Sequence, residues 1–174
     1  MQAVWRVAAL AAVCAGLLAC SPGLNWRLVR AEAAPLTLLL PCKPDRASKP
    51  VPLGGKSTTL SMVGCEAEGA TFALAMADIG DAAQAGAVLA QWQALSLHNM
   101  RASTPVLAPA KITGASADPA PVRVQAQGQQ ADGRTVQSQG VYFARGSRVF
   151  QAVIYAPRIE ADVADTFFGS IQFE

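Results

Sequence analysis

Residues 136–156 read VQSQGVYFARGSRVFQAVIYA, and this stretch decides the fold. Apolar and aromatic residues alternate with other residues on both sides of Gly146-Ser147, which is typical of two antiparallel strands joined by a tight turn. We expect strands over residues 136–145 and 148–156, the second one ended by Pro157. The side chains expected on the core side of this hairpin are Val141, Phe143, Phe150, Val153 and Tyr155.

Shorter alternating segments predict further strands on both sides of this hairpin. The expected strands are residues 25–30, 36–40, 58–64, 70–77, 122–127 and 171–173, with one short edge strand within 106–112. Residues 58–64 and 70–77 form a hairpin with its turn at 65–69. Its expected core side chains are Leu60, Met62, Phe72, Leu74 and Met76. Residues 43–55 are rich in proline and glycine, so we expect a loop there.

The periodicity changes to that of a helix after residue 80. Apolar residues spaced by three and four positions define one stripe, and they are Ala85, Val88, Leu89, Trp92 and Leu95. Asp81 is a suitable N-cap, with Gln84 three positions later, so the helix is expected over residues 82–101. A second helix is expected over residues 160–169. Paired strands with two helices indicate an α+β domain, an antiparallel sheet flanked by helices.

The N-terminus has the layout of a secretory signal, with Arg6 followed by the apolar run of residues 7–18. This run is too short for a membrane-spanning helix, which needs about 20 apolar residues. Leu17-Leu18-Ala19-Cys20 resembles the lipobox of bacterial lipoproteins. The resemblance implies that Cys20 receives a diacylglycerol on sulfur after cleavage before it, and that Ser21 directs the protein to the outer membrane. We therefore expect residues 1–19 to be a signal peptide.

The remaining 155 residues suffice for one domain, expected over 25–174, behind a lipidated tether of residues 20–24. This part of the chain carries 13 basic and 12 acidic residues and no basic stripe, which argues against nucleic acid as a partner. Cys42 and Cys65 are an even pair in an oxidising compartment, and we expect a disulfide between them. Two buried free thiols are the alternative.

Motifs that resemble catalytic or ligand-binding signatures are incomplete. Residues 54–58, GGKST, lack the earlier glycine of a phosphate-binding loop, and residues 114–118, GASAD, lack the final glycine of a nucleophile elbow. The lone His98 and two cysteines lack the spacing of a zinc site. We assign no catalytic residue, cofactor or metal. A hydrolase using His98, and a small-ligand carrier with a cavity of several hundred Å³, remain as alternatives.

Residues 140–153 and 164–171 are similar to the ending of small envelope proteins with a PsbP-like α/β/α sandwich, in which a hairpin with Arg-Gly-x-Arg precedes a short helix with Phe-Phe-x-Ser. Residues 41–44, PCKP, resemble a turn of such proteins. The resemblance implies an antiparallel sheet flanked by helices and a non-catalytic accessory role. It supplies no catalytic residues.

Tyr142 and Phe143 are adjacent on a strand and must face opposite sides of the sheet. Burial of both is one interpretation. Exposure of Tyr142 is the other, and it would form a partner surface with Arg145 and Arg148. The sequence as a whole predicts an envelope lipoprotein on the periplasmic face of the outer membrane. It would act as a non-enzymatic accessory or binding module for another envelope component, with its partner and oligomeric state unspecified.

Overall fold

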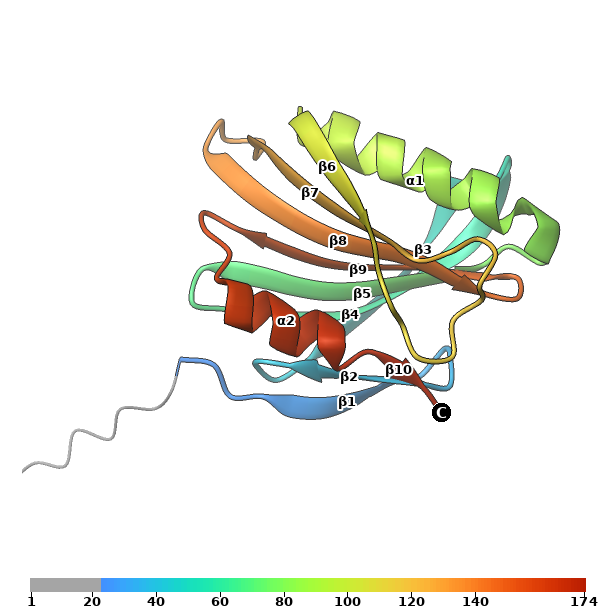
Figure 1. Cartoon of the computed structure of the whole chain (residues 1–174), viewed down its shortest axis with the longest axis horizontal. Helices are drawn as coiled ribbons and strands as arrows, with labels where there is room; N and C mark the ends of the chain where they lie inside the picture. Colours follow the sequence, from blue (N-terminus) through green and yellow to red (C-terminus); the bar gives the residue numbers. More distant parts are fainter. Residues whose placement is uncertain (1–22) are drawn as a thin grey trace, which may run out of the picture.

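The computed structural model describes residues 23–174, which form two antiparallel sheets and two α-helices (Figure 1). The large sheet has seven strands in the order β3-β4-β5-β9-β8-β7-β6, and the small sheet has three in the order β1-β2-β10. The strands are β1 (Arg27–Ala31), β2 (Leu36–Leu40), β3 (Asp45–Leu53), β4 (Lys56–Ala67), β5 (Ala70–Asp78), β6 (Ser103–Pro109), β7 (Val122–Gln129), β8 (Thr135–Arg145), β9 (Arg148–Ala156) and β10 (Gln172–Phe173). The helices are η1 (Ala82–Gln84), α1 (Ala85–Asn99) and α2 (Ala161–Gly169). The expected signal peptide, residues 1–19, and Cys20 lie outside the described residues.

The hairpin of β8 and β9 lies in the middle of the large sheet, as its apolar sequence predicts. Its register pairs Phe143 with Phe150 and Arg145 with Arg148, so the turn is Gly146-Ser147. Gly146 has a φ of 58°, a left-handed conformation that glycine adopts without strain. Strand β9 also pairs with β5, and the three central strands are therefore hydrogen-bonded along both edges.

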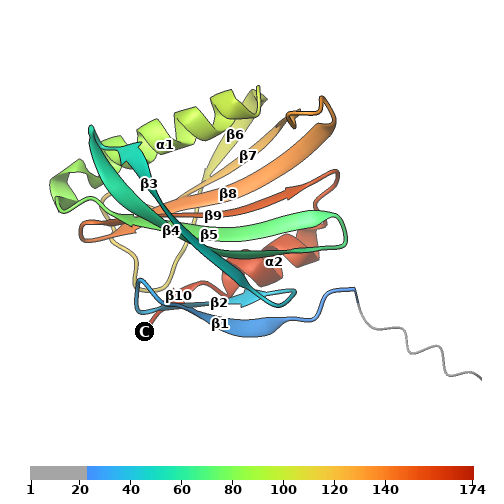
Figure 2. The same cartoon turned by 180° about the vertical axis from the view of Figure 1, so that it is seen from behind.

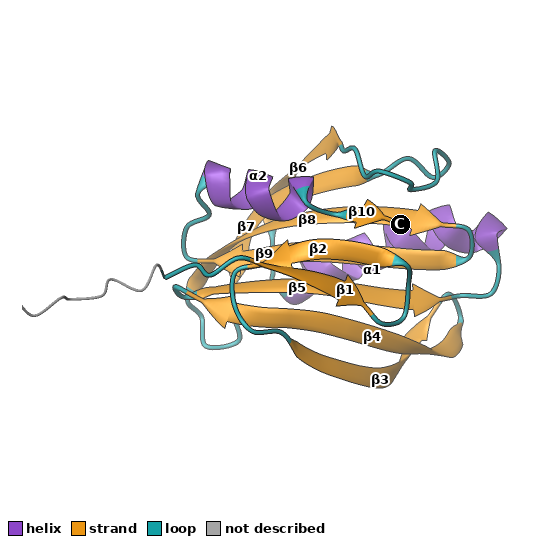
Figure 3. Cartoon of the chain, turned by 90° about the horizontal axis from the view of Figure 1, so that it is seen from below, coloured by secondary structure: helices purple, strands orange, loops and turns teal. Residues whose placement is uncertain are grey.

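One face of the large sheet is covered by the small sheet and α2 (Figure 3). We call it the small-sheet face. Phe143 and Phe150 stack here with ring centroids 4.9 Å apart, and Phe173 of β10 packs edge-on against both rings. Phe167 of α2 packs edge-on against Phe72 of β5 in the same core. These aromatic contacts hold the C-terminal segment against the sheet.

Helix α1 covers the opposite face, which we call the α1 face (Figure 2). Small side chains on the sheet there allow the helix to approach closely, and they include Ala75, Ala77 and Ala144. The predicted helix is confirmed, and Asp81 caps its start by accepting a hydrogen bond from the Ala83 N–H at 2.9 Å. The predicted stripe is buried except at its last member, Leu95, whose exposure is 51%.

The predicted fold class is wrong. An α+β domain with an antiparallel sheet flanked by helices, like a PsbP-like sandwich, does not describe a chain whose residues 23–174 form ten strands and two α-helices. The fold is dominated by its sheets. A three-stranded sheet made from both ends of the described chain covers much of the face where helices alone were expected, because β10 returns to pair with β2.

Three predicted details also differ from the structure. Residues 43–55 contain strand β3 instead of a loop, and the first strand begins at Arg27 instead of residue 25. The two predicted sets of core side chains belong to two cores, because both faces of the central strands are buried. Four of the ten face α1, namely Leu60, Met62, Val153 and Tyr155. The other six lie on the small-sheet face and are Phe72, Leu74, Met76, Val141, Phe143 and Phe150.

The predicted disulfide is confirmed. Cys42, which follows β2, is bonded to Cys65 of β4, and their Cα atoms are 5.9 Å apart. The bond joins the segment that follows β2 of the small sheet to β4 of the large sheet. It therefore links the two layers covalently at one border of the core.

Prolines protect both edges of the large sheet. Pro50 and Pro52 alternate along β3, so their ring nitrogens face away from the ladder with β4. At the other edge, β6 carries Pro105 and Pro109, and the ladder with β7 continues beyond it through the Ala110 N–H to Pro121. Each proline removes a donor with which another strand could pair, which disfavours edge-to-edge association.

Removal of the disulfide by the double substitution Cys42→Ala and Cys65→Ala should lower the free energy of unfolding by about 3 kcal/mol, since the bond closes a loop with a sequence separation of 23. Urea denaturation with and without reductant measures this change. The urea midpoint of the double variant should not change with reductant. If reductant also leaves the urea midpoint of the wild-type protein unchanged, the disulfide does not contribute to the free energy of unfolding.

Replacement of Pro50 and Pro52 by threonine should produce concentration-dependent association, because it restores two outward N–H donors on an exposed edge. Sedimentation at rising concentration measures the effect. Ser48→Thr on the same strand is the control, since Ser48 already has its N–H. A double variant that sediments like the wild type at every concentration would show that the prolines do not protect this edge.

Candidate functional site

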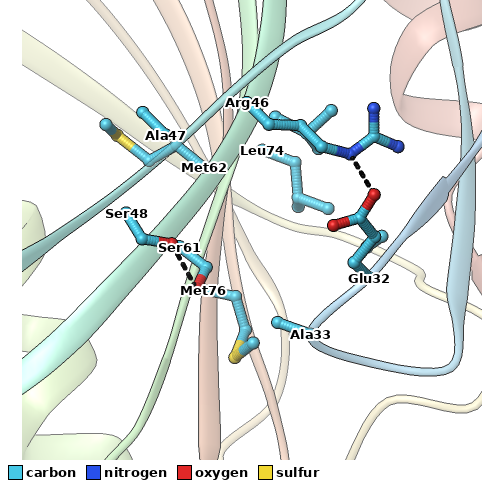
Figure 4. Close-up of a pocket in the computed structure, with 11 residues that line it drawn as sticks. Glu32, Ala33, Arg46, Ala47, Ser48, Ser61, Met62, Leu74 and Met76 are labelled. Carbon is cyan, nitrogen blue, oxygen red and sulfur yellow. Dashed lines mark hydrogen bonds and ion pairs between the residues drawn. The ribbon is translucent and has the colours of Figure 1, made fainter.

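An open groove lies on the small-sheet face, between the tip of the β1–β2 hairpin and strands β3, β4 and β5 (Figure 4). We call it the Arg46 groove. Its volume is about 380 Å³, and its lining residues are Ala31, Glu32, Ala33, Arg46, Ala47, Ser48, Ser61, Met62, Val63, Leu74 and Met76. The volume is within the range of small-ligand sites, about 300–1,000 Å³.

The groove exists because the small sheet is narrower than the large one. Strands β1 and β2 lie across the middle of the large sheet, whereas β3 and β4 extend beyond them (Figure 3). Side chains of β3 and β4 that face this side therefore lack a complete cover. The β1–β2 hairpin tip, with Glu32 and Ala33, forms the opposite wall.

An ion pair crosses the rim of the groove. The Arg46 Nε atom lies 3.0 Å from Glu32 Oε1, and Arg46 Nη2 donates to the Arg30 carbonyl at 3.1 Å. The side chains are 38% and 77% exposed, so the pair contributes at most about 1 kcal/mol. A bound group with its own carboxylate or amide can therefore compete for Arg46 at low cost.

The floor of the groove combines apolar surface with one pair of hydroxyls. Val63, Leu74 and Met76 are buried at its base. Ser48 and Ser61 face each other across β3 and β4, with their Oγ atoms 3.2 Å apart (Figure 4). The arrangement offers an apolar contact, a hydroxyl pair and both signs of charge within one concave surface.

Tyr142, Arg145 and Arg148 do not form the predicted partner surface. Tyr142 is only 5% exposed and lies under α1, where its hydroxyl accepts a hydrogen bond from Gln151 Nε2 at 2.8 Å. Arg145 and Arg148 lie on the other face of the sheet, because they alternate with Ala144 and Val149. The exposure of Tyr142 that this surface required is therefore contradicted.

Both arginines make contacts within the chain. The Arg145 guanidinium lies 4.7 Å from the centroid of the Phe173 ring, and Arg148 Nε lies 3.7 Å from Asp78 Oδ2. The Gly80 N–H, the Ser147 hydroxyl and the positive charge of Arg148 lower the pKa of Asp78. The arginines on either side of the β8–β9 turn therefore contact the neighbouring strands β10 and β5.

His98 lies in the last turn of α1 and is exposed. Among the hydrogen bonds of residues 23–174, none joins its ring to a serine or a carboxylate, and the nearby Ser96 hydroxyl accepts from Gln151. An enclosed carrier cavity has little room under α1, where the space beside Ser96 and Tyr142 measures about 10 Å³. No cluster of three or more potential metal ligands occurs in the same range.

The two incomplete motifs have structural roles. Gly54 and Gly55 form the β3–β4 turn with φ values of 62° and 77°. Ser116 accepts a hydrogen bond from the Gly146 N–H at 3.2 Å, and its own N–H donates to the Ala144 carbonyl at 2.7 Å. The loop that contains GASAD is thereby held beside the β8–β9 turn.

No known protein family and no curated protein sequence matches this chain. Among solved structures, the chain is similar to the crystal structure of a protein of unknown function, PA94 from Pseudomonas aeruginosa. The identity is 20%, the match covers 75% of this chain and 82% of the other, and the TM-score is 0.32. A likeness at this level carries no functional argument. Within residues 23–174, none of the helices has the length and apolar character needed to cross a membrane.

The Arg46 groove was missed by the sequence analysis. Arg46 and Ser48 lie in the segment expected to be a loop, and residues 45–49 have no apolar alternation that would indicate a strand. The contribution of Glu32 depends on how the small sheet packs on the large one, which no local pattern shows.

The two tyrosines should ionise only above their ordinary pKa of about 10. Burial raises the pKa of Tyr142, although hydrogen bonds with Ser96 and Gln151 oppose this shift. Burial, and to a smaller extent the nearby Tyr142, raises the pKa of Tyr155 to about 12. The unfolded chain then loses these protons before the native state does, so stability should fall as pH rises from about 10 toward 12.

An absorbance titration of tyrosinate in native and urea-unfolded protein measures both ionisations. Tyr142→Phe isolates the signal of Tyr155. A native titration with the same midpoint as the unfolded chain would contradict the burial of both hydroxyls.

Proposed function

We propose that the chain is a lipid-anchored protein of the cell envelope, facing the periplasm, that acts as a non-enzymatic binding module. Its Arg46 groove receives a short segment of another envelope protein. The mixed chemistry of this groove carries the proposal, since its apolar floor, hydroxyl pair and charged rim match the groups that a peptide segment presents together.

The lipobox-like residues 17–20 support the anchor, and the Cys42–Cys65 disulfide is consistent with an oxidising compartment. The described chain starts at Gly23, beside the side chain of Glu68 in the β4–β5 turn, and Trp26 packs edge-on against Phe72. Three extended residues span about 10 Å. A lipid on Cys20 would therefore hold this end of the molecule close to the bilayer.

The shape of the groove favours a partner segment over an enclosed small ligand. The groove is open to solvent along β3, and the described core beneath α1 is filled. Addition of a partner strand to β3 is disfavoured, because Pro50 and Pro52 remove two of the donors that a new ladder needs. The proposed contact therefore uses side chains in the groove and leaves the strand edge unpaired.

A photoreactive residue at position 33, on the groove wall opposite β3 and in the full-length lipidated chain, tests this function in the native envelope. Crosslinking should yield one defined adduct, and Arg46→Glu should reduce its yield at least about fivefold, the factor that about 1 kcal/mol produces. Cys20→Ser should remove the incorporated fatty acid and release the protein from the membrane fraction.

Arg134→Glu is the matched control, because Arg134 is also an exposed arginine in an ion pair, with Asp132 at 2.6 Å, but lies outside the groove. Equal adduct yields from Arg46→Glu and the wild type would refute the groove as the binding site. Retention of an unlabelled Cys20→Ser protein in membranes would refute the lipid anchor.

A further inference from the structure

A second concave site lies at the other border of the small-sheet face, between the segment that follows β6, strand β7 and the end of α2. We call it the Arg123 pocket. Its volume is about 250 Å³, and its lining residues are Pro109, Ala110, Lys111, Ile112, Arg123, Val141, Asp165, Phe168 and Gly169. This volume is below the range of pockets for drug-sized ligands, so the site suits a small molecule.

Arg123 is held in place, but its donors are not satisfied. Its guanidinium lies 4.9 Å from the centroid of the Phe168 ring, and its Nε is shielded from solvent without a hydrogen-bond acceptor. Asp165 Oδ1 is 3.7 Å from Nη2, beyond hydrogen-bond distance, and this carboxylate is 75% exposed. A shielded donor without an acceptor is uncommon in native proteins, so the position of this guanidinium has an energetic cost.

Lys111 provides a second positive charge on the facing segment. Its neighbours in the chain are anchored, since the Ala110 N–H donates to the Pro121 carbonyl at 3.0 Å and Ile112 is buried. Among residues 23–174, Lys111 forms no ion pair with a carboxylate. Two cations therefore line the pocket, and one exposed carboxylate is their counterpart.

The opposite charge lies on the α2 side of the pocket. Asp165 is there, and Gly169 is the last residue of α2, where the helix dipole places partial negative charge. Ile112, Val141 and Phe168 supply apolar surface to the same lining. A ligand that matches this arrangement has a carboxylate, an ammonium group and a small apolar part.

We propose that the Arg123 pocket binds a free α-amino acid with an apolar side chain. The ligand carboxylate contacts Arg123 and Lys111, its ammonium contacts Asp165, and its side chain lies against Ile112 and Phe168. A guanidinium binds a carboxylate through two parallel hydrogen bonds, and the two Nη atoms of Arg123 would donate them, since its Nε is shielded. The site is separate from the Arg46 groove and does not depend on the function proposed for it.

Calorimetric titration tests this proposal on residues 21–174 with the disulfide oxidised. Three related probes are used. They are leucine, 4-methylpentanoate, which lacks the ammonium, and 3-methylbutylamine, which lacks the carboxylate. Leucine should bind at least about tenfold more tightly than either analogue, because each analogue leaves one charged group of the site unpaired.

Substitutions separate the two charged contacts. Arg123→Gln should weaken leucine binding at least about tenfold, and Arg123→Lys should also weaken it, since lysine keeps the charge but not the paired donors. Asp165→Asn should weaken the binding of leucine but should not weaken the binding of 4-methylpentanoate, which has no ammonium group for Asp165 to contact. Arg145→Gln is the matched control, because Arg145 also packs on a phenylalanine, Phe173, but lies outside the pocket.

Three results would overturn the proposal. They are no binding of leucine at millimolar concentration to the folded wild type, equal binding of leucine and 4-methylpentanoate, and equal loss of affinity in Arg145→Gln and Arg123→Gln. Circular dichroism establishes that each variant is folded, and Arg123→Lys provides the test if Arg123→Gln does not fold.

Discussion

The stacking of Phe143 on Phe150 is the contact on which the rest of the structure depends. Both side chains are fully buried, and their rings are within 5° of parallel. The pair forms the floor on which Phe173 packs edge-on, and this contact brings the end of the chain back to β2. This packing acts together with the ladder between β10 and β2 and with the hydrogen bond from the Phe173 N–H to the Thr113 carbonyl.

The same hairpin also determines the layer on the other face. Side chains alternate along a strand, so the residues next to the phenylalanine pair, Ala144 and Val149, face α1. Both are small enough to bring the helix close to the sheet. One turn of two residues therefore sets the register for both cores, and a slip by one residue would exchange phenylalanine and alanine between the faces.

Both concave sites follow from unequal width of the two layers. Three strands and one short helix cannot cover seven strands, so the small-sheet face is left partly open at both borders. The Arg46 groove lies at the β3–β4 border and the Arg123 pocket lies at the β7–β8 border. Each border has an arginine on the strand beside the core, because an apolar side chain there would be exposed to water.

Local patterns predicted the β4–β5 and β8–β9 hairpins, α1, α2 and the disulfide, since each depends on neighbouring residues or on cysteine number alone. Strand β3 could not be distinguished from a loop, because Pro50 and Pro52 are breakers in a central strand but protective on an edge. The small sheet depends on pairing Phe173 with Leu36, which are far apart in the sequence. The two concave sites depend on how the small sheet and α2 pack on the large sheet, which no local pattern shows, and were therefore not predicted.

At the two ends of β2, the small sheet is joined to the large sheet by bonds of different strength. At one end the Cys42–Cys65 disulfide fixes the spacing between the small sheet and β4. At the other end, the hairpin tip is held to β3 by the exposed pair of Glu32 and Arg46. The covalent bond resists separation of the layers, whereas the ion pair contributes at most about 1 kcal/mol. A ligand that separates the layers would therefore do so at the hairpin tip, with the disulfide end as the fixed point.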